Sequence, residues 1–133
     1  MKSPAEITAG LSQFTGTENY YRTGVGKLLY TDGVKYLADA AGAYWLIDAI
    51  SSHQANPDVA AEGFQVWILK VVDHKGLLTC YRDYEAGLPE MANYSHYGVV
   101  VQHIPFTDFP LSEIKIWVEG GPEQPVALLP SEH

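Results

Sequence analysis

Cysteine is almost absent from this chain, which contains a single one, Cys80, in 133 residues. One thiol excludes an internal disulfide and a multi-cysteine zinc site. Cys80 lies in an apolar, strand-like run, where we expect a buried and chemically inert side chain. The missing disulfides fit a reducing compartment, so the sequence predicts a cytoplasmic protein.

Positive charge is scarce as well. Eight Lys and Arg residues stand against sixteen Asp and Glu residues, which gives a net charge of −8, and no basic cluster occurs. Direct binding to a nucleic-acid backbone is therefore disfavoured, because such binding depends on Lys and Arg. The acidity leaves one alternative open, a nucleic-acid mimic that opposes a host factor.

Long apolar runs are also missing. No stretch approaches the ~20 apolar residues of a membrane span, and residues 1–14 contain no apolar segment of signal-peptide length. We therefore expect no membrane association. The chain has 47% hydrophobic residues, a length of 133 residues and no internal repeat, which together predict a single domain over residues 1–133.

The strongest pattern that is present runs from Thr31 to Gln54 and predicts one buried central helix over about residues 32–54. Thr31 and Asp32 suit the N-cap and first turn of a helix, and Pro57 suits its end. Apolar residues occupy most of the helix circumference, which is typical of a core element. A shorter amphipathic helix is expected over residues 4–14.

Two residues of the central helix are assigned structural roles. Gly42 costs about 1 kcal/mol relative to alanine inside a helix, which suggests that another backbone passes close by. If Asp48 is buried, its carboxylate needs hydrogen-bond partners. The glycine-rich loop before the helix supplies the candidates Tyr20, Tyr21 and Arg22.

The second half of the chain reads as strands separated by turns. Strands are predicted at four or five places: 64–72, 77–84, 98–106, 114–118 and a short edge strand at 126–129. Residues 73–76 are expected to form a hairpin turn with Gly76 in the left-handed conformation. Helices followed by strands predict an α+β fold, with N-terminal helices and the central helix packed on an antiparallel sheet.

Neither face of this sheet is cleanly polar, because Trp67 and Trp117 occupy positions that alternate with apolar residues. A monomer rarely leaves a large apolar patch in water, so either the N-terminal segment covers this face or a second subunit does, and we expect a homodimer or an unidentified protein partner. The 13-residue stretch 85–97 is longer than a usual hairpin loop. Its Met91, Tyr94 and Tyr97 join the two tryptophans as the predicted contact surface.

Catalytic candidates are few. Asp58, Asp73 and Lys75 match the PD…DxK spacing of metal-dependent nucleases, in which two carboxylates hold Mg²⁺. That chemistry needs Asp73 and Lys75 on a strand, whereas here they fall in the predicted turn. His103 with Asp108 is a second candidate pair for acid–base work. No His or Cys spacing matches a metal site, so neither metal nor cofactor is predicted.

Several blocks of the sequence resemble a family of short bacterial proteins of unknown function. The blocks cover most of the chain: FTGTE from Phe14, TDGVKYLA from Thr31, GAYWLIDAI from Gly42, FQVW from Phe64, TDFPL from Thr107 and LPSE from Leu129. The resemblance implies a cytosolic bacterial domain with a link to mobile elements, and it supplies no activity, cofactor or catalytic residue. Similar proteins have a short acidic turn where this chain has residues 85–97.

The leading hypothesis from the sequence is a non-enzymatic, dimeric protein-interaction module. A metal-assisted hydrolase or nuclease and the acidic anti-host-factor protein are the alternatives.

Overall fold

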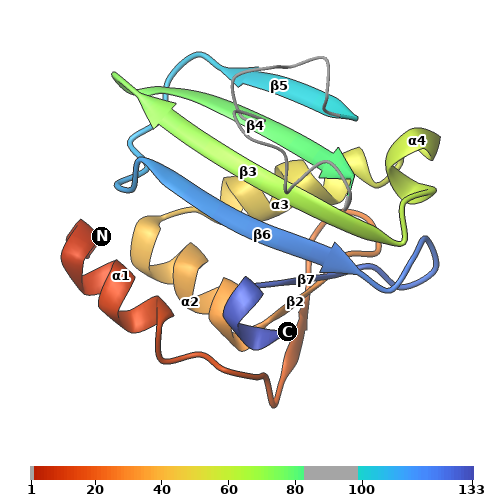
Figure 1. Cartoon of the computed structure of the whole chain (residues 1–133), viewed down its shortest axis with the longest axis horizontal. Helices are drawn as coiled ribbons and strands as arrows, with labels where there is room; N and C mark the ends of the chain where they lie inside the picture. Colours follow the sequence, from red (N-terminus) through yellow and green to blue (C-terminus); the bar gives the residue numbers. More distant parts are fainter. Residues whose placement is uncertain (1, 83–98) are drawn as a thin grey trace.

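The computed structural model describes residues 2–82 and 99–133, and it shows helices packed on one face of a mixed β-sheet (Figure 1). The described helices are α1 (Pro4–Leu11), α2 (Asp32–Ala41), α3 (Tyr44–His53), α4 (Pro57–Ala60) and the short 3-10 helix η4 (Pro130–Glu132). The described strands are β1 (Tyr20–Arg22), β2 (Leu29–Thr31), β3 (Phe64–Val72), β4 (Lys75–Arg82), β5 (Val100–Ile104), β6 (Glu113–Glu119) and β7 (Val126–Leu128). The predicted α+β class is confirmed.

The sheet is larger than predicted. Its seven strands in the described residues follow the order β1-β2-β7-β6-β3-β4-β5, whereas four to five were expected. It is also mixed rather than antiparallel, because β2 and β7 pair in parallel. The additional strands β1 and β2 have three residues each, which is too short to show an alternating pattern.

The predicted helix over residues 32–54 is two helices, because the chain turns at Gly42. This residue ends α2 in the left-handed conformation, with φ 61° and ψ 41°, and its N–H donates to the carbonyl of Ala38. The start was predicted correctly, since Thr31 is the N-cap and its hydroxyl accepts from Val34 N. Gly42 permits the positive φ that ends α2, and the predicted close approach of another backbone to it stays a prediction.

We expect Gly42→Ala to lower the free energy of unfolding by about 1 kcal/mol, because a Cβ makes the left-handed conformation unfavourable. Chemical denaturation measures the change. Gly63→Ala is the matched control, since its added Cβ meets no atom within 4 Å and Gly63 has no positive φ. Equal stability of the two variants would contradict the assigned role of Gly42.

The main core lies between the helices and the inner face of the sheet. Leu37 of α2 and Ile50 of α3 pack in one cluster with Trp67, Leu69 and Cys80 of the sheet. Cys80 is buried, as predicted. Each fully buried aliphatic side chain of this kind contributes roughly 2–3 kcal/mol by the area that it removes from water. The inner face of the sheet is therefore scaffold.

The β3–β4 turn is formed by different residues than expected. Asp73 and His74 adopt the left-handed conformation with φ 50° and 62°. Gly76 instead belongs to β4, where an added Cβ would lie 3.2 Å from the Cβ of Ile104. A two-residue turn with two positive φ values matches the right-handed twist of the flanking strands. The expected left-handed Gly76 was wrong.

Two further predictions concern the N-terminus and membranes. The N-terminal helix is confirmed as α1, where Ser3 and Glu6 form a capping box. Across residues 2–82 and 99–133, none of the helices combines the length and apolarity needed to cross a membrane.

Candidate functional site

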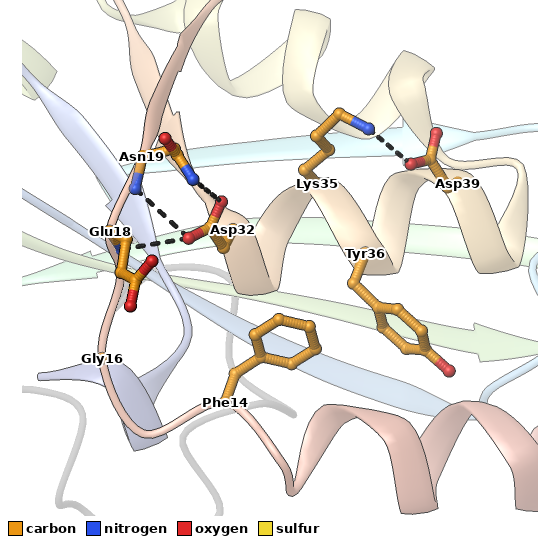
Figure 2. Close-up of a pocket in the computed structure, with 8 residues that line it drawn as sticks. All are labelled: Phe14, Gly16, Glu18, Asn19, Asp32, Lys35, Tyr36 and Asp39. Carbon is orange, nitrogen blue, oxygen red and sulfur yellow. Dashed lines mark hydrogen bonds and ion pairs between the residues drawn. The ribbon is translucent and has the colours of Figure 1, made fainter.

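The outward face of α2 forms the floor of a surface pocket. Asp32, Lys35, Tyr36 and Asp39 follow one another at helical spacing and therefore share one side of α2. Residues of the opposite side, such as Val34 and Leu37, are buried in the core. The pocket has a volume of about 490 Å³, and the segment between α1 and β1 completes its lining with Phe14, Gly16, Glu18 and Asn19 (Figure 2).

Asp32 fastens the segment before β1 to α2. One carboxylate oxygen, Oδ2, accepts the backbone N–H groups of Glu18 at 3.0 Å and Asn19 at 3.2 Å. The other, Oδ1, accepts the Tyr21 hydroxyl at 2.9 Å and the Asn19 side-chain amide at 3.4 Å. In return, Asp32 N donates to the Thr17 hydroxyl at 2.9 Å. These hydrogen bonds hold the segment before β1, which forms one wall of the pocket, against α2 (Figure 2).

The predicted link between the glycine-rich loop and the central helix exists, but Asp48 is not its carboxylate. Asp48 is exposed on α3, so it is not a buried carboxylate in need of donors. The carboxylate that binds the loop is Asp32, and its hydroxyl donor is Tyr21. Tyr20 and Arg22 are exposed in the edge strand β1. The choice of Asp48 failed because one continuous helix, apolar around most of its circumference, was assumed.

Hydrogen bonding keeps Asp32 ionised. The backbone N–H of Glu18, with further bonds from Tyr21, Asn19 and Thr17, lowers the pKa of Asp32 from 3.8 to about 2, although partial desolvation opposes the shift. A carboxyl with a lowered pKa in the folded state adds stability above its unfolded pKa and loses it as the pH falls through the folded value. The stabilisation by Asp32 is therefore lost between about pH 4 and pH 2.

We expect Asp32→Asn to lower the thermal unfolding midpoint at pH 5 and the difference from wild type to shrink as the pH falls to 2. The physical reason is that protonation removes the same charge from the wild type. Midpoints from circular dichroism between pH 5 and pH 2 test this. Asp108→Asn, at an exposed position, is the control with the same charge change. A difference that stays constant with pH would contradict the assignment.

A second set of bonds joins α2 to α3 at the far end of the pocket. Lys35 Nζ lies 2.9 Å from Asp39 Oδ2, and the Tyr44 hydroxyl donates to Asp39 Oδ1 at 2.5 Å. The bonds from Tyr44 and Lys35 lower the pKa of Asp39. The same Asp39 carboxylate raises the pKa of Tyr44 to about 12. At neutral pH, Asp39 is therefore anionic and Tyr44 is neutral.

An aromatic pair forms the apolar part of the pocket. The rings of Phe14 and Tyr36 have centroids 5.3 Å apart. Tyr36 is seated against α1 at Gly10, where an added Cβ would lie 2.0 Å from the Tyr36 hydroxyl oxygen. The ammonium of Lys2 already lies 5.7 Å from the centroid of the Tyr36 ring. The Tyr36 ring is thus held against α1, and one ammonium group already lies within cation–π distance of it.

The charges and rings of the pocket define what it can do. Three carboxylates and one ammonium line it, and two aromatic rings lie beside them. A cation fits such a lining, because it gains from carboxylates and from the face of an aromatic ring. General acid–base catalysis at neutral pH fits poorly, since it needs a pKa near 7 and those of Asp32 and Asp39 are lowered.

The predicted nuclease residues do not come together. Asp58 lies in α4, before β3, whereas Asp73 lies in the turn after β3 and Lys75 begins β4. The whole of β3, nine residues or about 30 Å of extended strand, lies between the segments that carry Asp58 and Asp73. Among residues 2–82 and 99–133, no three His, Cys, Asp or Glu side chains are grouped so that they could hold a metal ion.

The second predicted pair, His103 and Asp108, is exposed at both positions. His103 points outward from β5, and Asp108 lies in the connection to β6. Neither position provides the enclosure that a catalytic pair needs.

Of the five residues predicted to form a contact surface, the structure describes only the two tryptophans, and one of them is buried in the core. Trp67 is 1% exposed, and its Nε1 donates to Gln65 Oε1 at 2.9 Å, so its indole belongs to the core rather than to an interface. Trp117 is half-buried on the other face of the sheet, 5.2 Å from the Phe64 ring. Three further predicted residues lie outside the described residues: Met91, Tyr94 and Tyr97.

The pocket on α2 was missed as a site, although part of its signal is in the sequence. The polar spacing of Asp32, Lys35, Tyr36 and Asp39 marks one exposed helix face. Sequence spacing could not show that Phe14 returns to this face, because that depends on the Asp32 hydrogen bonds to the loop.

The model of a family of unknown function, DUF6876, matches residues 5–133. No curated protein and no solved structure matches the chain. The family match spans the pocket and the whole sheet.

Proposed function

This chain belongs to the family of unknown function DUF6876, and we propose that it is a non-enzymatic binding protein whose pocket on α2 takes a cationic side chain of a protein partner. The observation that carries the proposal is the aromatic pair of Phe14 and Tyr36 placed beside carboxylates that are already ionised and fixed. This arrangement selects for a positive charge on a flat or slender group.

A guanidinium group is the preferred ligand. It can stack on the Tyr36 ring and donate to a carboxylate at the same time, which an ammonium does less well. The Glu18 carboxylate makes no hydrogen bond or ion pair within the described part of the chain, and it lies next to Asp32 on the pocket wall (Figure 2). Glu18 is therefore the acceptor available to an incoming group, while Asp32 holds the wall in place.

Lys35 is the one lining residue whose charge opposes a cation. Its ammonium is paired with Asp39 at 2.9 Å and lies 5.5 Å from the centroid of the Tyr21 ring. Both contacts weaken the repulsion that the Lys35 ammonium would exert on a cation in the pocket. A stacked guanidinium gains about 0.5–2 kcal/mol, and a hydrogen bond to a charged group about 1.5–3 kcal/mol. After the cost of association, a single side chain should bind with a Kd in the millimolar range.

Titration with N-acetylarginine methylamide tests the proposal, with N-acetylcitrulline methylamide as the uncharged isosteric control. We expect saturable binding of the arginine compound and affinity at least about fivefold weaker for citrulline, because its urea has the same shape but no charge and carries an oxygen in place of one NH2 donor. The arginine affinity should also fall when salt rises from 50 to about 300 mM. Equal binding of the two compounds, or binding of neither, would refute the proposal.

A cytoplasmic homodimer of bacterial origin is the second part of the proposal. The half-buried Trp117, with Phe64 at 5.2 Å and His133 at 5.3 Å, is an aromatic group on the sheet face opposite the helices, which suits an interface. Sedimentation equilibrium of the wild type and of Trp117→Ala tests dimerisation, and a wild-type monomer would refute it.

A further inference from the structure

A second pocket lies on another side of the molecule and differs in character. It has a volume of about 520 Å³ and is bounded by the loop between β1 and β2, the end of α3, α4 and the β6–β7 turn. Its apolar lining consists of Val25, Ala55, Ala60, Pro122 and Pro125. A volume of this size and a mainly apolar wall are typical of small-molecule sites.

The wall formed by the β1–β2 loop is fixed before any ligand binds. The Val25 carbonyl accepts the Ser51 hydroxyl, and the Thr23 hydroxyl lies 2.5 Å from the same oxygen. Gly26 has a φ of +72°, and an added Cβ would lie 3.0 Å from Ser51 Oγ. Val25 itself is 50% exposed, which places an apolar side chain at the rim. A rigid apolar rim lowers the entropy cost of binding.

The opposite wall, from the β6–β7 turn, is tied to the same loop. Leu29 N donates to the Pro125 carbonyl at 2.9 Å, and the Gln124 side-chain amide donates to the Lys27 carbonyl at 3.1 Å. The two prolines have fixed φ angles and add stiffness. Both walls are therefore held at a set separation.

The polar groups at the end of α3 are already engaged. The Ser51 and Ser52 carbonyls accept the N–H groups of Gln54 and Ala55, and the Ser52 hydroxyl donates to the Asp48 carbonyl. The lining includes no carboxylate, and Lys27 is its one charged side chain. No ion pair joins Lys27 to another residue within 2–82 or 99–133. An anionic group is therefore the charge complement of this pocket.

We propose that this pocket binds a small amphiphilic carboxylate, with its apolar body between Val25, Ala55 and Pro122 and its carboxylate at the Lys27 ammonium. The pocket on α2 carries the opposite charge preference, so the two sites take different ligand classes. The present proposal does not depend on the one made for α2.

Three probes with one apolar body separate the contributions: 4-phenylbutanoate, 4-phenylbutanol and 4-phenylbutylamine. Titration by amide chemical shifts should place the acid at Gly26, Lys27 and Ala55. We expect the acid to bind about fivefold more tightly than the alcohol, a modest factor because Lys27 is exposed and water screens its charge. The amine should bind more weakly than either, because the Lys27 ammonium repels it. Equal affinity for all three, or shifts elsewhere on the protein, would overturn the proposal.

Two variants and a control complete the test. Lys27→Gln should bring the acid and the alcohol to within about twofold of each other, because the charge complement is removed. Ala55→Trp should fill the pocket and abolish binding of both. Lys75→Gln removes one positive charge at the distant β3–β4 turn and should change neither affinity. An unchanged preference for the acid in Lys27→Gln would refute the role of Lys27, and binding to Ala55→Trp would refute the site.

Discussion

Replacing Glu132 by glutamine is expected to lower the free energy of unfolding by about 2–3 kcal/mol. Glu132 lies in η4, at the end of the chain, and its carboxylate binds the start of α2. Oε1 accepts the Thr31 hydroxyl at 2.6 Å and Leu129 N at 2.9 Å, while Oε2 accepts Gly33 N at 3.0 Å. A negative charge at this place also interacts favourably with the helix dipole of α2.

Glutamine keeps the size of the side chain but cannot replace these bonds. Its amide nitrogen would face a donor, either the N–H of Gly33 or the groups around Oε1, and one buried donor would lose its acceptor. Gly33 admits no side chain here, since an added Cβ would lie 2.5 Å from Glu132 Oε1. The packing of η4 against α2 is therefore close. The glutamine variant loses hydrogen bonds in this contact, which is where the loss of stability arises.

Chemical denaturation of Glu132→Gln measures this effect. Glu123→Gln is the matched control, because it makes the same change at an exposed position in the β6–β7 turn. We expect the control to stay within about 0.5 kcal/mol of the wild type. Equal stability of the two variants would contradict the assigned role of Glu132.

Tyr36→Ala is expected to reduce binding of N-acetylarginine methylamide by about tenfold, since it removes the ring on which the guanidinium stacks. Tyr36→Phe keeps that ring and should bind within about twofold of the wild type. The ring is held by its contact with Gly10 and lies 5.3 Å from Phe14, so both define its position. Circular dichroism of each variant shows whether the fold is retained.

Gly10→Ala offers an independent check of the same ring. The added Cβ would lie 2.0 Å from the Tyr36 hydroxyl oxygen, so the ring must move while its chemistry is unchanged. We expect weaker binding of the arginine compound than in the wild type. Full affinity in both Tyr36→Ala and Gly10→Ala would contradict stacking on Tyr36.

The α+β class, both ends of β3 and the position of β6 could be predicted from the sequence, because these two strands show clear patterns over nine and seven residues. The start of β4 at Lys75 was predicted two residues too late. The start of α2 could be predicted from Thr31 and Asp32. The break at Gly42 could not, because apolar spacing continues across it and only the positive φ reveals the turn. Strand β1 was missed because pairing, rather than local pattern, defines a strand of three residues.

The candidate site was less accessible to prediction than the fold. Large aromatic residues were assigned to an interface because such residues are common there. Trp67 instead lies in the core, and its Nε1 donates a hydrogen bond to Gln65. The important carboxylate was assigned to Asp48 rather than Asp32, because a buried carboxylate was sought within the helix instead of at its first turn. Hydrogen bonds from Glu18 and Asn19 to Asp32 decide where Phe14 lies, and sequence spacing does not encode them.

The central claim is that a guanidinium stacks on the ring of Tyr36, beside the Phe14 ring, and donates to the Glu18 carboxylate. The most direct measurement is a set of intermolecular nuclear Overhauser effects in the complex with N-acetylarginine methylamide. We predict effects from the arginine δ-methylene protons to the ring protons of Tyr36 and Phe14. Effects to the Trp117 ring instead, with none to Tyr36, would contradict the claim.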